Sequence, residues 1–234
     1  MKGLVITILL IAGVVVLWMT AFPSVTVRYR LTLEVELNGE RKTGSSVSEV
    51  SYRKNPQFLG ASANMVAEVR GEAVWVDLGE RDALFALLAS GGHPRSAPEY
   101  VIPVVFDVTT DGVGPEEFSR IGALKGRREV PLELVPSMVR LRNVNDPKNV
   151  ELVAPAGHGL KLVRATIEIV DAGYWPLNQI GLSGVPMSHK IRDELPWLGD
   201  RSGMDTFRRS LYGAGFGANG SSGAVGTLLT SGRY

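Results

Sequence analysis

The chain has 234 residues, a length that favours one domain. Apolar residues make up 44% and charged residues 21%, with 25 basic against 24 acidic side chains, so the chain can bury a core and has no bulk charge to attract a nucleic acid. The absence of cysteine excludes disulfides, thiolate chemistry, iron-sulfur clusters and zinc ribbons, and with only 3 histidines we expect no cofactor.

The first element is an apolar segment at residues 3–22, which contains no charge and only two threonines as polar interruptions. As a helix, about 20 such residues span about 30 Å, the thickness of the hydrocarbon core of a bilayer. Trp18 fits an interfacial anchor near one end, and Pro23 ends the helix where the apolar run ends. We therefore predict a transmembrane anchor at residues 1–23 that contacts the lipid bilayer through residues 3–22.

A cleaved secretory signal is the alternative interpretation of this segment. The apolar part of such a signal is usually about 7 to 15 residues long and is followed by a cleavage site with small residues. Residues 19–21 and 22–24 each place a bulky side chain where a small one is needed, which favours a retained anchor.

Basic residues give opposing indications of membrane orientation. Lys2 precedes the apolar segment, whereas Arg28, Arg30, Arg41 and Lys42 follow it, and by count this places the body in the cytoplasm. A long domain can cross the membrane regardless of such charges, and the two residues before the segment offer little to export. We therefore expect the body on the extracytoplasmic side.

The strongest strand pattern follows the anchor. Residues 25–37 alternate between apolar and polar side chains without interruption, the period of a half-buried strand. Asn38-Gly39 then favours a type I′ hairpin turn, so the next strand should return through residues 41–52, antiparallel to the first. Because that second strand is rich in small polar residues, we expect it to be the more exposed of the two.

Further strands are predicted at residues 66–69, 73–78, 100–110, 130–134, 138–144, 150–153 and 160–170. Residues 81–89 fit a short helix or a buried strand equally well. Repeated strands at short spacing indicate a mainly β fold, either an antiparallel sandwich or an open barrel, carried by one N-terminal transmembrane helix and accompanied by a few short peripheral helices.

Short helices are predicted after Pro115 and at residues 205–212. From residue 213 the composition shifts to glycine and serine, and few of these side chains can offset the cost of ordering the backbone. The expected organisation is thus an anchor at residues 1–23, a β-rich domain at residues 24–212 and a flexible tail at residues 213–234 that only a partner would order.

Three short motifs resemble known chemistry but lack its context. Residues 215–220 match the glycine spacing of a dinucleotide site without a strand before them or a helix after them. Residues 51–54 have the Ser-x-x-Lys spacing on a predicted strand, where the two side chains diverge, and residues 181–184 are one residue short of a nucleophile elbow. We interpret all three as turns or loops.

The histidines His93, His158 and His189 show no short helical spacing that would place two of them on one metal. His189 with Asp193 and Glu194 is the best isolated candidate for proton transfer, but we favour a surface ion pair, because exposed pairs of this type are common. A membrane-tethered hydrolase or transferase would need His189 to meet Asp193, Asp200 and Asp205, with or without a hard cation.

Large aromatic residues suggest packing more than ligand binding. Trp75 lies on a predicted strand and is expected in the core. Leu195, Pro196, Trp197 and Leu198 form an apolar cluster outside any periodic element. They form either a clasp that closes the sheet or a patch that docks on a partner.

Five short stretches of the sequence together carry a resemblance. They are residues 28–32 (RYRLT), 44–47 (GSSV), 145–148 (NDPK), 165–169 (ATIEI) and 195–198 (LPWL). They resemble a family of uncharacterised bacterial membrane-anchored proteins, which implies an N-terminal membrane helix and a compact body and brings no reaction, cofactor or catalytic residue. We expect the chain in the bacterial inner membrane, with its body on the periplasmic side.

The resulting expectation is a single-pass accessory or protein-interaction module of the bacterial cell envelope without evident catalytic activity. Its partners would be the bilayer and another membrane or envelope protein, contacted through sheet edges and the polar second strand. The membrane-tethered hydrolase or transferase is the alternative, and a periplasmic binding module for a small ligand is a third class that would need an apolar pocket.

Overall fold

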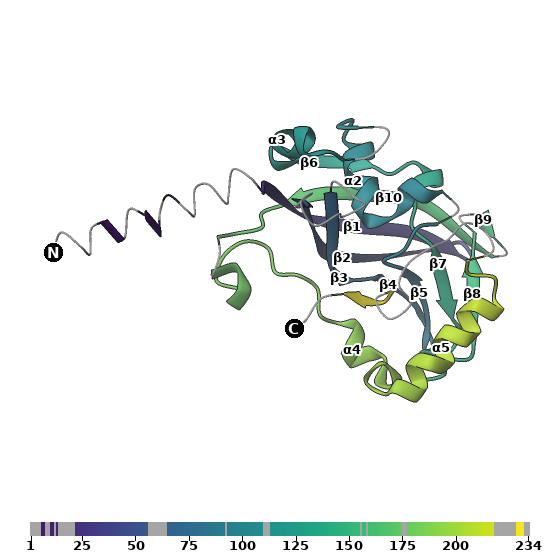
Figure 1. Cartoon of the computed structure of the whole chain (residues 1–234). Coiled ribbons are helices and arrows are strands. Elements are labelled where there is room, and N and C mark those ends of the chain that lie inside the picture. The colour runs from purple at the N-terminus through teal and green to yellow at the C-terminus, as the bar shows by residue number, and fades with distance from the viewer. Residues whose placement is uncertain are drawn as a thin grey trace.

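The structure, a computed structural model, describes residues 6–7, 10–11, 13, 22–55, 65–91, 93–109, 113–154, 156–157, 159–174, 177–217 and 228–231. Two antiparallel sheets dominate these residues (Figure 1). The strands of the large sheet are β1 (Ser24–Leu37), β2 (Glu40–Lys54), β3 (Met65–Glu72), β6 (Gly126–Glu129), β9 (Ala156–Gly157), β10 (Leu160–Val170) and β11 (Thr230–Ser231). The strands of the small sheet are β4 (Val74–Gly79), β5 (Asp82–Ala86), β7 (Met138–Leu141) and β8 (Val150–Val153).

The strand order in the large sheet is β11-β3-β2-β1-β10-β6, with β9 beside β10, and in the small sheet it is β4-β5-β7-β8. The helices are short: η2 (Pro94–Ser96), α2 (Pro98–Val105), η3 (Pro115–Glu117), α3 (Phe118–Gly122), η4 (Leu132–Leu134), η5 (Leu177–Ile180), α4 (Ile191–Glu194), η6 (Pro196–Gly199) and α5 (Arg201–Gly213). The mainly β class is confirmed.

The first hairpin forms as its sequence predicts. Leu37 pairs with Glu40, which leaves a two-residue loop, and Asn38 and Gly39 have φ angles of 54° and 84°. Both values are positive, as a type I′ turn requires. The register of β1 and β2 then follows from the turn, and β10 pairs with the other side of β1.

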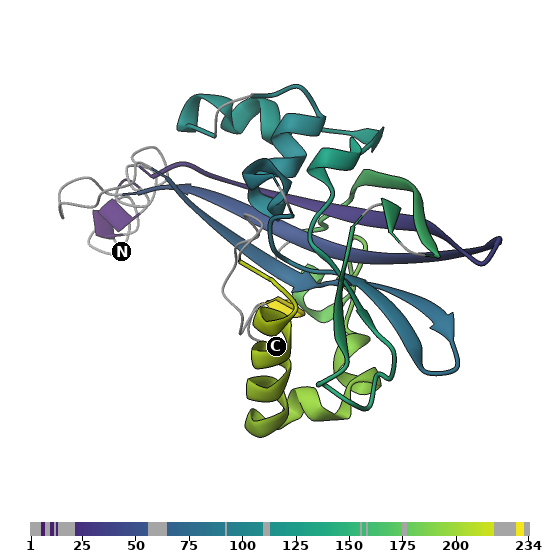
Figure 2. The same ribbon diagram turned by 90° about the vertical axis from the view of Figure 1, so that its right-hand side faces the viewer.

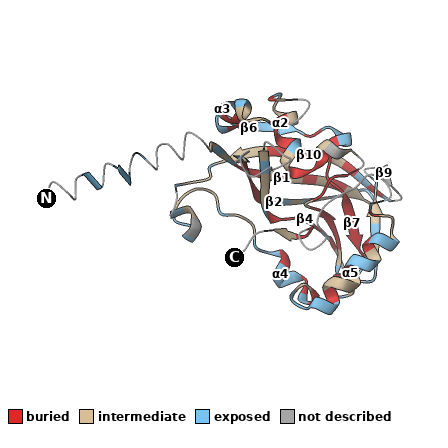
Figure 3. Cartoon of the chain, in the orientation of Figure 1, coloured by how far each residue is buried: buried red, intermediate tan, exposed pale blue. Residues whose placement is uncertain are grey.

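The core lies on one face of this hairpin. Alternate side chains of β1, including Val27, Tyr29 and Leu33, are buried against the small sheet and against α2 and α3. Figure 2 shows α2 and the small sheet next to the long strands of the hairpin, and Figure 3 shows the buried residues gathered in the body where these elements meet. Ala73 is the corner at which the chain passes from β3 in the large sheet to β4 in the small one.

Residues 100–110, predicted as a strand, instead contain most of α2. Pro98 at the first helical position favours a helix start, and Pro103 inside the helix lacks the N–H that would bond to the Glu99 carbonyl. The buried Tyr52 hydroxyl donates to that carbonyl at 2.8 Å. Tyr52 of β2 thus satisfies the Glu99 carbonyl that Pro103 leaves without a donor. The sequence pattern of residues 100–110 alone does not indicate this hydrogen bond.

Two further predictions need correction. Residues 132–134, expected in a strand, form η4 after Pro131. The second strand is not the exposed partner, because residues 46–50 are buried and β2 lies between β1 and β3, away from the sheet edges. The ambiguous residues 81–89 contribute β5, so the structure confirms the strand alternative.

The glycine-rich C-terminal region is also more ordered than predicted where it is described. Phe216, Leu228 and Leu229 are buried in the second core cluster, and Thr230 pairs with Glu72 in β3. The Leu229 carbonyl accepts a 2.8 Å hydrogen bond from the Ala73 amide. Two adjacent leucines therefore tie the end of the chain to the corner between the sheets, which the prediction of a tail over residues 213–234 missed.

Most of the predicted anchor, residues 3–22, lies outside the described residues. Those described within it are Ile6, Thr7, Leu10, Ile11 and Gly13, which are helical and exposed, and Phe22. Within the described part of the chain, no helix is both long and apolar enough to cross a membrane. The transmembrane helix therefore remains a prediction, as does the interfacial position of Trp18.

Candidate functional site

The face of the large sheet opposite the core carries opposite charges on neighbouring strands. Arg30 on β1 lies beside Glu168 on β10 with Nη1 and Oε2 2.8 Å apart, and Arg164 on β10 bonds to Glu34 on β1 at 2.6 Å. These four side chains remain partly exposed. Surface pairs of this kind contribute little to stability, so their regular arrangement makes a polar, rigid surface.

One pair on this face is buried. Arg28 is 2% exposed, and its Nη2 lies 2.9 Å from Oε2 of Glu49, its direct neighbour on β2. The third guanidinium donor, Nη1, bonds to the Val185 carbonyl at 2.8 Å. Arg28 therefore ties the segment around Val185 to the sheet, since all its donor nitrogens are engaged.

The chain from residue 185 to residue 191 runs across the same face. Ser188 exchanges two hydrogen bonds with Val47 of β2, at 2.9 and 3.1 Å. Glu72 of β3 then accepts from the amides of Lys190 and Ile191 at 2.6 and 3.2 Å. This segment explains why the middle of β2 is buried on both faces.

Glu72 is a buried carboxylate at 2% exposure. Burial raises the pKa of the Glu72 carboxyl above its usual value, while the Ile191 and Lys190 amides and the charge of His189 lower it in part. His189 is thus close enough to Glu72 to influence its charge, although no catalytic geometry follows from that influence.

The described residues 172–174 and 177–184, here named the apolar loop, lie between the end of β10 and the covering segment at residues 185–191. The Val185 amide donates to the Asp171 carbonyl at 2.8 Å and closes the base of the loop. Within the loop, the amides of Asn178 and Leu182 bond to the carbonyls of Tyr174 and Leu177, both at 2.9 Å. The apolar loop therefore has its own internal scaffold.

Two glycines allow the stems of the apolar loop to touch. Gly173 and Gly184 have φ angles of 69° and 71°, and a Cβ on Gly184 would collide with the backbone of Gly173. The Ser183 hydroxyl accepts from the Tyr174 amide at 2.9 Å and spans the same contact. The predicted turn at residues 181–184 is part of this scaffold.

The side chains that this loop presents are apolar and exposed. Tyr174 is 79% exposed, Leu177 45%, Ile180 69% and Leu182 71%. Sequence reasoning did not single out these residues. The available signal was a set of large apolar side chains between Gly173, Gly181 and Gly184, in a segment that has no strand or helix period.

The cluster of Leu195, Pro196, Trp197 and Leu198 behaves as the clasp. Leu195 and Trp197 are buried in the second core cluster, Leu198 is half-buried and Pro196 is exposed. The Trp197 indole donates to the Val144 carbonyl at 2.7 Å, and its ring stacks on Phe207 of α5 with centroids 5.2 Å apart. The surface that could dock on a partner is therefore small.

Two of the three carboxylates proposed to act with His189 have local roles. Asp200 accepts from the Gly203 amide at 3.2 Å and caps α5, and Asp205 pairs with Arg208 at 2.7 Å. Over the residues that the structure describes, no group of three or more histidine or acidic side chains is placed to hold a metal ion. The hydrolase alternative gains no support from this arrangement.

The remaining motifs are parts of turns and strands. Ser51 lies on β2 with its hydroxyl 2.9 Å from that of Thr26, and His93 Nδ1 accepts from the Arg95 amide at 3.1 Å. Gly215 follows helix α5 directly, so the dinucleotide spacing there lacks its strand. Trp75 is only half-buried, with its ring 4.9 Å from Phe85. His158 and residues 218–220 lie outside the described residues.

Neither of two cavities in the described part of the body favours a small-ligand module. The cavity beneath the large sheet, lined by Tyr29 and Leu31 among others, has a volume of about 10 Å³, room for one water molecule. A shallower groove of about 400 Å³ lies between the ends of β1 and β10 and the chain after α3. Its lining includes Lys125 and Asp171 and is as polar as it is apolar, unlike a typical ligand pocket.

Compared with family models, with curated proteins and with solved structures, the chain has no match. The site is thus known by its geometry alone: a charged sheet face, a buried arginine that holds the covering segment, and an apolar loop.

Proposed function

We propose that the chain is a single-pass, membrane-anchored accessory or interaction module of the bacterial cell envelope, held in the inner membrane with its body on the periplasmic side. The observation that carries the proposal is the junction between the apolar segment and the body. The charge-free residues 3–22 are followed at once by β1, and the Lys54 amide bonds to the Pro23 carbonyl at 3.1 Å. No linker separates an anchor from the sheet, so the body would stay at the bilayer surface.

The partner we propose is another membrane or envelope protein. The open face around Arg30, Glu168 and Arg164 offers alternating charges on a rigid sheet, which favours specificity over affinity. The edge strand β6 is exposed along its whole length but carries Arg127, Arg128 and Glu129, a composition that discourages pairing with further strands. The sheet face is therefore the better candidate surface.

Site-specific photo-crosslinking in the native membrane tests this proposal. A crosslinker at Arg164 should give a reproducible adduct of defined mass, because Arg164 lies on the open face. Arg142, which pairs with Glu151 of the small sheet at 3.0 Å, is the matched control with similar exposure. A crosslinker at Arg142 should give no adduct. A chain extracted without detergent, or one that gives no adduct at Arg164, contradicts the proposal. A reporter fused to the C-terminus tests the side of the membrane.

A further inference from the structure

We propose that the apolar loop is a second contact with the lipid bilayer, beside the N-terminal anchor. This inference rests on the proposed function, because it needs the anchor in the membrane. The loop would insert its apolar side chains into the boundary between headgroups and acyl chains while the body remains outside.

The first support is the concentration of exposed apolar side chains. Tyr174, Leu177, Ile180 and Leu182 lie within nine residues of one loop, whereas other exposed large apolar residues such as Leu132 and Tyr212 lie on separate helices. Scattered apolar residues are normal on a soluble surface, but a group of this kind marks a surface that is covered in use.

The second support is that the loop is built to present these side chains. Its base is closed by the bond between Asp171 and Val185, and Arg28 holds Val185 on the sheet. The amides of Tyr174 and Leu182 are bonded within the loop. These hydrogen bonds therefore fix the conformation in which the apolar side chains are exposed. While the bonds persist, the side chains stay outside the core.

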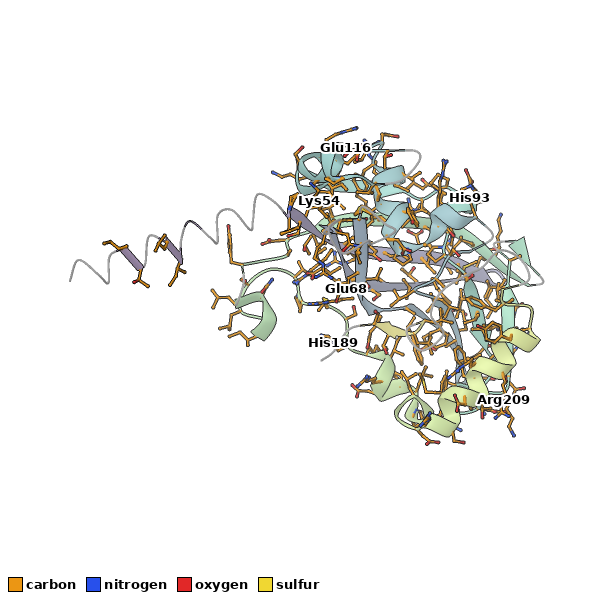
Figure 4. The ribbon with its side chains drawn as sticks, viewed as in Figure 1. Lys54, Glu68, His93, Glu116, His189 and Arg209 are labelled. Atoms are coloured by element: carbon orange, nitrogen blue, oxygen red, sulfur yellow. The ribbon has the colours of Figure 1, made fainter. Side chains whose placement is uncertain are left out.

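The third support is position. Val170 at the base of the loop lies directly opposite Arg28, four residues beyond Ser24, where the chain enters β1. At about 3.3 Å per residue this places the base about 13 Å from the exit of the predicted anchor. In Figure 4, the η5 segment of the loop projects from the same side of the body as Lys54, whose amide bonds to Pro23. A bilayer that holds the anchor is thus within reach of the loop.

The charges at this end suit a phospholipid surface. Arg53 and Lys54 end β2 beside Ser24, and Lys125 lines the groove next to Asp171. Glu68 offsets Arg53, with which it pairs at 3.5 Å, so the exposed lysines supply most of the attraction to anionic headgroups. Apolar side chains with a basic flank are the combination found in segments that lie in the membrane interface.

Depth-dependent quenching in the full chain tests the inference. Because the chain has no cysteine, each of Ile180→Cys, Leu132→Cys and Leu10→Cys carries one environment-sensitive fluorophore. Each variant is reconstituted into vesicles of phosphatidylcholine and phosphatidylglycerol, with quenchers either on the lipid chains or in the water. Leu132, 53% exposed, is the control on η4, which packs against η2 near His93, on the side of the body away from Lys54 in Figure 4.

On vesicles, the emission of the fluorophore at Ile180→Cys should shift to the blue, and the lipid quencher should remove most of its intensity. The fluorophore at Leu132→Cys should be quenched only by the aqueous quencher. Quenching of Ile180→Cys from water, to the extent of Leu132→Cys, overturns the inference. Shielding of Ile180→Cys from both quenchers also overturns it, because a protein then covers the loop. The Leu10→Cys label separates the two proposals: if the lipid quencher does not reach it, the anchor itself fails.

Discussion

Two apolar clusters lie outside the strands of this protein, and they have opposite environments. Residues 195–198 send Leu195 and Trp197 into the core, whereas the apolar loop holds Ile180 and Leu182 in solvent. Their compositions are similar, so hydrophobicity does not distinguish them. The difference lies in where their polar groups find partners.

The Trp197 indole bonds to Val144, which belongs to another part of the chain, and its ring stacks on α5. The apolar loop instead closes its hydrogen bonds among its own residues, between Tyr174, Leu177 and Ser183. One cluster is therefore part of the folded body, and the other is attached to it through Val185. Substitutions at the two clusters should have different consequences, and the following changes test that difference.

The largest effect is expected for Trp197→Ala. The substitution removes a buried ring and leaves the Val144 carbonyl without its donor, so we expect a loss of about 3 to 5 kcal/mol in the free energy of unfolding. Thermal and chemical denaturation of the full chain in detergent would measure it. Tyr212→Ala on the exposed face of α5 is the control, and a Trp197→Ala protein as stable as that control would show that the cluster is not a clasp.

Arg28→Met breaks the connection between sheet and loop. It leaves Glu49 buried without its partner, which costs about 3 kcal/mol or more, and it frees the Val185 carbonyl. Hydrogen exchange should rise in residues 172–188 more than in the small sheet. Combining the change with Glu49→Leu removes both charges and should restore most of the lost stability, and additive losses in the double variant would contradict this coupling.

The sequence predicts this hairpin well because its information is local. Period-two alternation and Asn38-Gly39 determine β1, β2 and their register, which already places Arg28 opposite Glu49. Their burial is not local, since it depends on Val185, 157 residues from Arg28 in the sequence. The candidate site could therefore be predicted as a pair of charges but not as the attachment point of a loop.

Predictions failed where contacts between distant segments decide the structure. α2 contains an apolar, β-branched run typical of a strand, yet Tyr52 satisfies the carbonyl that Pro103 leaves unpaired. Ser46 lies in the middle of a buried strand because its hydroxyl bonds to the Glu72 carbonyl at 2.7 Å. In both cases a single hydrogen bond from another element changes the environment that composition alone would suggest.

Glu72→Gln tests the contact between β3 and the covering segment, which connects the two apolar clusters along the chain. Because burial raises the pKa of Glu72 in the folded state, the unfolded chain releases this proton first as the pH rises. The contribution of Glu72 to stability therefore falls as the pH rises above the ordinary pKa of a glutamate, about 4.3. The charges of His189 and Asp193, which act on Glu72, remain in the variant. Melting temperatures measured across this range should decline less for Glu72→Gln, and an equal decline would contradict the raised pKa.

The smallest effect on folding is expected for Ile180→Ser. The side chain is exposed and makes no core contact, so the free energy of unfolding in detergent should change by less than about 0.5 kcal/mol. The same substitution should matter in vesicles, because a serine gains nothing from the acyl boundary, and protease sensitivity of the apolar loop should then rise. Leu132→Ser provides the matched control, since it removes an equally large exposed side chain on the other side of the body. Equal protease sensitivity of wild type and Ile180→Ser in vesicles would mean that the loop is exposed for a reason other than contact with lipid.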